Sequence, residues 1–293
     1  MIHYDAEGHV TVPGGRIWYG ICGDLSAGDA PLVAVHGGPG MSHDYLTPLA
    51  DLARKRPVIF YDQLDAGRSD RPNDPANWTL PRFLTELDAL RDALNVTRLH
   101  LFGNSWGGTI AAAYASTRPE GLQSLILSSP LIHTDTWLAD NAAYRATLPP
   151  ESLATMDRCE AERRTDAPAY LAAVDVFYTR HLCRTQPWPE EVLRTFDAMN
   201  PDCYAAMWGP NEFTCSGVLR GYDGRAALAR ITTPTLVTCG EYDEATPTST
   251  ARFAAMIPGA QFEMFPDASH MAFIETRAAY IARLESFLNA RTA

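Results

Sequence analysis

The chain has 293 residues, of which 46% are apolar and 20% are charged, and its formal net charge is −11. These proportions are typical of a folded globular protein and exclude a disordered or fibrous chain. The length predicts about two domains, or one large α/β unit with an insertion. Because an acidic chain lacks the basic surface that binds phosphate backbones, we expect no nucleic-acid partner.

No stretch approaches the roughly 20 apolar residues that span a bilayer, and the first residues show neither a basic nor an apolar leader segment. We therefore expect no membrane partner and a cytoplasmic location. The six cysteines are scattered without a C-x-x-C pair, which predicts a reducing compartment and no zinc or redox motif. We expect neither a metal nor another cofactor, and the sequence leaves the oligomeric state open.

Short strands and helices alternate along most of the chain. Two β-branched runs, residues 9–12 and 16–19, flank Pro13-Gly14-Gly15 and predict a hairpin. Continuous apolar runs of the kind that forms strands covered on both faces follow at residues 32–35, 58–61, 99–102, 122–127, 235–238 and 262–265. Apolar residues at helical spacing lie within residues 83–94 and 280–288. This alternation predicts an α/β fold with a mostly parallel sheet flanked by helices.

The alternation stops between residues 131 and 230, where helical segments punctuated by proline take over. We interpret this region as an inserted helical cap, or lid, on a core formed by residues 1–130 and 231–293. Eight aromatic residues lie between Tyr170 and Phe213. We expect most of them to form the core of the cap and a minority to line a pocket.

A serine nucleophile is predicted at Ser105. The segment G-N-S-W-G-G, residues 103–108, follows the apolar run 99–102 and precedes a helical stretch, which matches a nucleophile elbow. Glycines flank the serine because so tight a turn leaves no room for side chains. The hydroxyl then stands at the positive end of a helix. The alternative is an ordinary turn between a strand and a helix.

Acyl transfer at a serine also needs two N–H donors for the oxyanion of the tetrahedral intermediate. In an elbow the residue after the nucleophile, here Trp106, supplies one donor. We expect the second from the segment H-G-G-P-G, residues 36–40, and favour the Gly38 amide, with Gly37 as the alternative. His36 is expected to brace this loop by hydrogen bonds rather than to move protons.

The serine hydroxyl needs a histidine base, and the histidine needs an acid that fixes its tautomer. In this fold the chain order is serine, acid, histidine, with the last two on loops after late strands. His270 alone among the eight histidines meets this condition. Asp243, after the preceding strand, is the predicted acid, and Glu241 and Asp267 are the alternatives.

Two further carboxylates suggest what is bound. Glu244 directly follows the predicted acid, and Glu212 lies among aromatic residues and turn formers near the end of the cap. A partly buried carboxylate needs a cationic partner. If the two side chains converge, the ammonium group of a substrate would be a suitable partner, because its pKa would rise beside two anions.

Four segments resemble the prolyl aminopeptidase (proline iminopeptidase) family of α/β-hydrolases, with particular likeness to the tricorn-interacting aminopeptidase and to aminoacyl amide hydrolases of macrolactam antibiotic biosynthesis. They are HGGPGMSHDY (residues 36–45), FYDQ with GRS (60–63 and 67–69), GPNEF (209–213) and GEYDE (240–244). The resemblance implies an α/β-hydrolase core with a helical cap and no cofactor. It also implies site residues: a triad of Ser105, Asp243 and His270, oxyanion donors at Gly38 and Trp106, and Glu212 and Glu244 as ligands of the substrate's free amine.

Together these features predict a serine hydrolase that cleaves an N-terminal amino acid, proline, alanine or similar, from a small peptide or aminoacyl amide through an acyl-enzyme. The side chain of Trp106 is expected to face the first substrate residue and restrict its size. A terminal aminoacyl group on a natural-product intermediate is a further candidate substrate, in keeping with a chain whose only lysine is Lys55. The alternatives are an esterase or amidase without a free-amine requirement and a non-catalytic ligand-binding protein.

Overall fold

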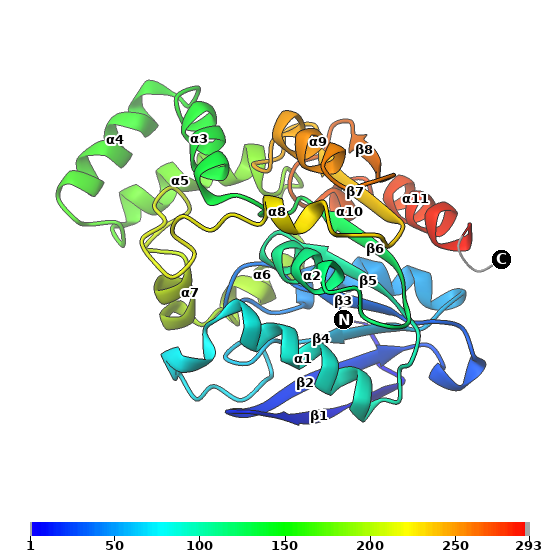
Figure 1. The fold of residues 1–293 in the computed structure, drawn as a ribbon. Helices are drawn as coiled ribbons and strands as arrows, with labels where there is room; N and C mark the ends of the chain where they lie inside the picture. Colours follow the sequence, from blue (N-terminus) through cyan, green and yellow to red (C-terminus); the bar gives the residue numbers. More distant parts are fainter. Residues whose placement is uncertain (1, 291–293) are drawn as a thin grey trace.

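A single eight-stranded sheet forms the centre of the computed structural model, which describes residues 2–290 (Figure 1). The strand order is β1-β2-β4-β3-β5-β6-β7-β8. β1 and β2 form an antiparallel hairpin, β2 pairs antiparallel with β4, and the remaining strands are parallel to one another. The predicted α/β fold with a mostly parallel sheet is confirmed.

The strands form where the apolar runs predict them. Their bounds are β1 (Ala6–Val12), β2 (Gly15–Cys22), β3 (Leu32–Val35), β4 (Val58–Tyr61), β5 (Leu99–Asn104), β6 (Leu122–Ser128), β7 (Thr235–Gly240) and β8 (Gln261–Phe265). The expectation that every run is covered on both faces is wrong for β8. That strand lies at the edge of the sheet, and its Phe262 and Met264 side chains are 37% and 39% exposed.

Helices cover both faces of the sheet. Alternate side chains of each central strand enter two different apolar clusters, Val33 and Val35 in one, Leu32 and Ala34 in the other. The first cluster includes side chains of α1 (Leu80–Ala93), α2 (Trp106–Ser116), α8 (Arg225–Leu228) and α9 (Pro247–Ala255). The second includes those of the 3-10 helix η2 (Asp44–Arg54), α10 (Ala272–Glu275) and α11 (Arg277–Asn289).

Six helices lie between β6 and β7 in the chain, and the first five lie beyond the carboxyl ends of the parallel strands, in the green to olive part of Figure 1. These five are α3 (Thr134–Arg145), α4 (Pro150–Ala161), α5 (Pro168–His181), α6 (Glu190–Asp197) and α7 (Pro201–Met207). α4 and α5 pack around a small apolar cluster of their own that contains Met156 and Phe177. The division into a core and a cap of residues 131–230 stays a prediction; within that cap, α8 packs against α2.

Two short 3-10 turns complete the described chain, η1 (Leu25–Ala27) and η3 (Pro75–Asn77). Among residues 2–290 no helix has the length and apolar character needed to cross a bilayer.

Candidate active site

Ser105 occupies a sharp turn between β5 and α2. Its backbone has φ 54° and ψ −119°, a left-handed conformation that is strained for a residue with a side chain. The flanking glycines make the turn possible: a Cβ on Gly103 would lie 2.3 Å from the Gly107 carbonyl oxygen, and one on Gly107 would lie 2.2 Å from that of Val35. The predicted elbow geometry is therefore present, with Ser105 directly before the first residue of α2.

Asp243 and His270 come from the loops after β7 and β8, and their side chains are buried. The Nδ1 atom of His270 lies 2.8 Å from Oδ1 of Asp243. A carboxylate only accepts, so Nδ1 carries the proton that it donates, and Nε2 of the neutral ring is left as the acceptor. The alternative acids are elsewhere: Glu241 accepts a hydrogen bond from the backbone N–H of Asp267 near the surface.

Three further donors hold the Asp243 carboxylate. The Ser129 hydroxyl donates to Oδ2 at 2.5 Å, and the backbone N–H groups of Gly240 and Ala245 donate at 3.2 and 2.8 Å. Trp137 of α3 packs its indole edge-to-face on the His270 ring, with the centroids 5.8 Å apart. Both members of the acid–histidine pair are therefore fixed in orientation before any ligand arrives.

The Gly-rich loop after β3 offers one amide to a ligand. The N–H of Gly37, the alternative donor, is already donated to the Tyr45 hydroxyl at 2.6 Å. The Gly38 N–H has no acceptor among residues 2–290, and neither does that of Trp106, the first residue of α2. These contacts favour Gly38 over Gly37 as the second N–H donor to an oxyanion.

His36 is buried, and its hydrogen bonds hold the loop after β3 in place. It accepts a hydrogen bond from the Gln63 backbone N–H at Nε2 (3.0 Å), and its carbonyl accepts one from the Gln63 side chain (2.8 Å). Burial lowers the pKa of His36 and so favours the neutral ring. The Trp106 indole is also anchored: its Nε1 donates to Gln63 Oε1 at 2.9 Å, and the ring is 1% exposed.

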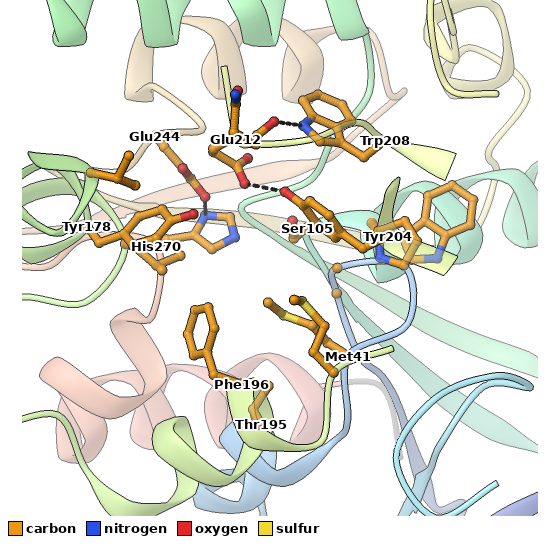
Figure 2. A pocket seen from close by; sticks show the side chains of 18 of the residues that line it. Met41, Ser105, Tyr178, Thr195, Phe196, Tyr204, Trp208, Glu212, Glu244 and His270 are labelled. Carbon is orange, nitrogen blue, oxygen red and sulfur yellow. Dashed lines mark hydrogen bonds and ion pairs between the residues drawn. The ribbon is translucent and has the colours of Figure 1, made fainter. Parts of the chain in front are cut away.

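Glu212 and Glu244 line one cavity together with Ser105 and His270 (Figure 2). Glu212 accepts hydrogen bonds from the Tyr204 hydroxyl (2.8 Å) and the Trp137 indole (3.3 Å). Glu244 is 3% exposed; its Oε1 lies 3.8 Å from His270 Nδ1, and its Oε2 has no hydrogen-bond partner among the described residues.

The two glutamates influence each other's ionisation. Burial, followed by the charges of Glu212 and Asp243, raises the pKa of Glu244 well above its ordinary value. Burial also raises the pKa of Glu212, but the Tyr204 hydroxyl, His270 and the Trp137 indole oppose that rise. Both carboxyl groups therefore favour the neutral form while no cation lies between them. A cation placed between them would lower both pKa values and leave both side chains charged.

The cavity has a volume of about 630 Å³, within the usual range for small-molecule sites. Six of the eight aromatic residues between positions 170 and 213 line it, so the expectation that only a minority would do so is wrong. Four of the six lie on α5, α6 and α7, and two lie in the segments next to these helices. The six are Tyr170, Tyr178, Trp188, Phe196, Tyr204 and Trp208.

Comparisons with known proteins agree on one family. The chain matches the family described as alpha/beta hydrolase fold over residues 30–276. It is 41% identical to a proline iminopeptidase of Heyndrickxia coagulans, over 97% of this chain and 98% of that protein, and 37% identical to one of Saccharolobus solfataricus, over 97% and 92%. The chain belongs to the proline iminopeptidase family of α/β-hydrolases.

Solved structures of this family superpose closely on the chain. The crystal structure of VinJ has a TM-score of 0.96 at 36% identity and covers 99% of this chain and 100% of its own. That of proline iminopeptidase from Mycobacterium smegmatis has a TM-score of 0.90 at 35% identity, with 98% coverage of both chains. The family and the fold expected from the sequence are confirmed, and the protein is a hydrolase of the prolyl aminopeptidase type.

Several residues that shape the site of this proline iminopeptidase relative escaped the sequence analysis. The Ser129 hydroxyl donates a hydrogen bond to Asp243, and the Trp137 indole and the Tyr204 hydroxyl donate to Glu212. The Tyr45 hydroxyl accepts the N–H of Gly37. No local pattern marks them. Tyr45 alone had a signal, because it ends the segment of residues 36–45 that resembles the family.

The carbonyl of His181, at the end of α5, links this helix to both loops that carry Asp243 and His270. It accepts hydrogen bonds from the backbone N–H groups of Glu244 (3.3 Å) and His270 (3.2 Å). The imidazole of His181 stacks on Tyr144 at 4.1 Å and bonds through Nδ1 to the Tyr242 carbonyl. Within residues 2–290, no three His, Cys, Asp or Glu side chains gather in a way that could hold a metal ion.

Proposed function

We propose that the protein removes the N-terminal amino acid from a small peptide or aminoacyl amide through an acyl-enzyme on Ser105. The observation that carries this proposal is the pair of carboxylates, Glu212 and Glu244, in the cavity that Ser105 and His270 also line. Glu244 has a buried oxygen without a donor among the described residues, and such an acceptor is costly to leave unpaired. The N–H groups of a substrate ammonium, three in a primary amine and two in proline, would satisfy it and neutralise the paired charge.

The chemistry follows from the arrangement of the other side chains. The Ser105 hydroxyl attacks the carbonyl carbon of the first residue while Nε2 of His270 takes its proton. The oxyanion receives the N–H groups of Gly38 and Trp106. The C–N bond then breaks, His270 returns the proton to the leaving amine, and a water molecule hydrolyses the ester by the same route. Asp243 keeps the His270 ring in the required tautomer.

Binding of the amine explains why the enzyme would act only at a chain end. Glu212 and Glu244 hold the ammonium on one side of Ser105, so the carbonyl one residue away is the one presented for attack. A substrate whose amine is blocked would bring an amide hydrogen in place of the cation and leave two acidic side chains without a counter-charge.

The first test compares an alanyl or prolyl p-nitroanilide with its N-acetylated form. We expect kcat/KM for the free amine to exceed that for the acetylated substrate by at least about 30-fold, the lower end of what a lost buried charge partner costs. Equal rates would establish the esterase or amidase alternative instead.

The second test replaces each carboxylate with its amide. Glu244→Gln and Glu212→Gln are each expected to lower kcat/KM on the free-amine substrate by about 30-fold to several thousand-fold, equivalent to about 2 to 5 kcal/mol. Glu241→Gln, three positions before Glu244 in the same loop but partly exposed, is the matched control and should retain wild-type activity. A wild-type rate in both active-site variants would contradict the assigned role.

A fluorophosphonate probe separates enzyme from receptor. Covalent labelling that disappears in Ser105→Ala supports the acyl-enzyme, whereas folded wild-type protein that resists labelling would favour a non-catalytic ligand-binding protein.

The width of the cavity favours a bulky leaving group, as in an aminoacyl group attached to a natural-product amine. Apolar side chains from the loop after β3 and from α6, including Met41 and Phe196, line the part of the cavity away from the carboxylates (Figure 2). We expect an alanyl amide of a large apolar amine to have a higher kcat/KM than alanyl-glycine, because it buries more apolar surface there. A preference for the dipeptide would favour a general peptidase.

A further inference from the structure

The two proposed oxyanion donors come from separate parts of the chain. Gly38 belongs to the loop after β3, with φ +48°, and Trp106 opens α2 after β5. β3 and β5 are neighbours in the sheet, but their backbone pairing ends at Val35 and Gly103. Beyond that point some other contact must set the distance between the two amides. Two buried side chains, Tyr45 and Gln63, make such contacts.

Tyr45 bridges the loop to the residue before the nucleophile. Its hydroxyl accepts the Gly37 N–H at 2.6 Å and donates to Oδ1 of Asn104 at 2.7 Å. The Asn104 side chain is itself fixed, because its Nδ2 donates to the Ser128 carbonyl at 3.1 Å. Tyr45 is 3% exposed and Asn104 fully buried, so water does not compete for these bonds.

Gln63 bridges the same loop to the residue after the nucleophile. Its Nε2 donates to the His36 carbonyl at 2.8 Å, and its Oε1 accepts the Trp106 indole N–H at 2.9 Å. Its backbone N–H also donates to Nε2 of His36 at 3.0 Å. Gln63 follows β4, so a third strand takes part in this contact.

We propose that Tyr45 and Gln63 are positioning residues that hold the loop of residues 36–40 against both sides of Ser105, so that the Gly38 and Trp106 amides meet at one point. One bridge ends at Asn104 and the other at Trp106, which opposes both sliding and rotation of the loop. The proposal rests on the oxyanion donors assigned under the proposed function. Such donors must stand about 2.7–3.1 Å from the oxyanion, and a displacement of about 1 Å can cost about 100-fold in rate.

The test is Tyr45→Phe, which keeps the ring and removes the bridging oxygen. We expect kcat to fall about 10- to 100-fold with KM unchanged within about twofold, because the loss appears only when the oxyanion forms. The inhibition constant of an alanyl aldehyde, which forms a tetrahedral adduct on Ser105, should rise by the same factor as kcat falls. That of the product amino acid should not change.

Tyr114→Phe is the matched control. The Tyr114 hydroxyl also makes two side-chain contacts, with Asp88 and Arg91, but it lies at the far end of α2 from Ser105. A general loss of stability would affect both variants in thermal unfolding, whereas the change in kcat and aldehyde inhibition should be confined to Tyr45→Phe. If Tyr45→Phe does not fold, Gln63→Leu, which removes the second bridge, decides by the same measurements.

A wild-type kcat in Tyr45→Phe and Gln63→Leu, or a parallel rise in KM and in the product's inhibition constant, would overturn the proposal. Hydrolysis of p-nitrophenyl acetate separates this outcome from failure of the proposed function, because that ester has no amine yet passes through the same oxyanion. An enzyme that cleaves the ester but no aminoacyl amide is not an aminopeptidase, and the loss of ester hydrolysis in Tyr45→Phe would still support the positioning role.

Discussion

Two buried aspartate–histidine pairs in this molecule share one geometry. His270 Nδ1 lies 2.8 Å from Asp243 Oδ1 in the candidate active site, and His43 Nδ1 lies 2.8 Å from Asp62 Oδ1 beside Trp18 of β2. In both pairs backbone N–H groups also donate to the carboxylate. The acid–histidine contact alone therefore does not mark a catalytic pair.

The second ring nitrogen distinguishes them. Nε2 of His43 is 2.6 Å from the Tyr4 hydroxyl, and the ring stacks on Trp18 with the centroids 4.6 Å apart. His270 has Trp137 against its ring edge-to-face and lines the cavity that holds Ser105. A base needs a ring nitrogen that is open to a nucleophile; Nε2 of His43 is taken up by Tyr4, whereas His270 lines the same cavity as Ser105.

The largest expected difference between the two histidines is in enzyme activity. His270→Ala should lower kcat/KM by about four orders of magnitude or more, because the serine loses its base. His43→Ala, measured per folded molecule, should lower it far less. Steady-state kinetics on an aminoacyl p-nitroanilide measures both, and similar losses in the two variants would break the comparison.

The reverse order is expected for stability. His43→Ala removes the imidazole from the fully buried Asp62 carboxylate and leaves it only backbone N–H donors, which should cost about 3 to 5 kcal/mol of unfolding free energy in urea titration. His270→Ala opens onto the cavity, where water can reach Asp243, and should cost less. A His270→Ala variant that is the less stable of the two would contradict this prediction.

Acid unfolding gives a smaller difference. Burial opposes the ionisation of Asp62, but His43, His36 and the Arg68 backbone N–H outweigh it and lower the pKa of Asp62 well below its ordinary value. The stability that this carboxylate contributes is therefore present above about pH 4, its unfolded pKa, and is lost as the pH falls further.

Asp62→Asn should accordingly be less stable than wild type at pH 7 and lose less stability between about pH 4 and pH 2. Thermal midpoints across that range measure the difference. The exposed Asp166→Asn is the control and should follow the wild-type curve. An Asp62→Asn curve parallel to that of wild type would show that Asp62 does not contribute to the loss of stability in acid.

The fold followed from patterns that a sequence carries locally. The runs at residues 32–35 and 58–61 match β3 and β4 because buried parallel strands are apolar throughout and end abruptly. The run at residues 262–265 was placed correctly but taken as covered on both faces. An apolar run indicates that a strand is hydrophobic, but it does not indicate whether other elements cover both faces of that strand.

The residues of the candidate site likewise fall into two groups, those that a local sequence pattern marks and those that it does not. The turn at Ser105 could be predicted because the elbow is contiguous, and His270 could be put forward as the base because chain order removes His43 despite its identical contact with an aspartate. Ser129 and Tyr204 could not, because their bonds to Asp243 and Glu212 depend on how loops and helices meet in space. The aromatic residues of the cap were found by composition, yet composition cannot tell which wall a ring faces.

The bonds from the Glu244 and His270 amides to the His181 carbonyl bear on how substrates reach Ser105. If the whole cap swung away from the sheet, both bonds would break, and the carboxylate and the imidazole would lose their shared support in the same movement. A substrate that entered by a local rearrangement, for instance of Leu171, which is 55% exposed and borders the cavity, would leave both bonds intact.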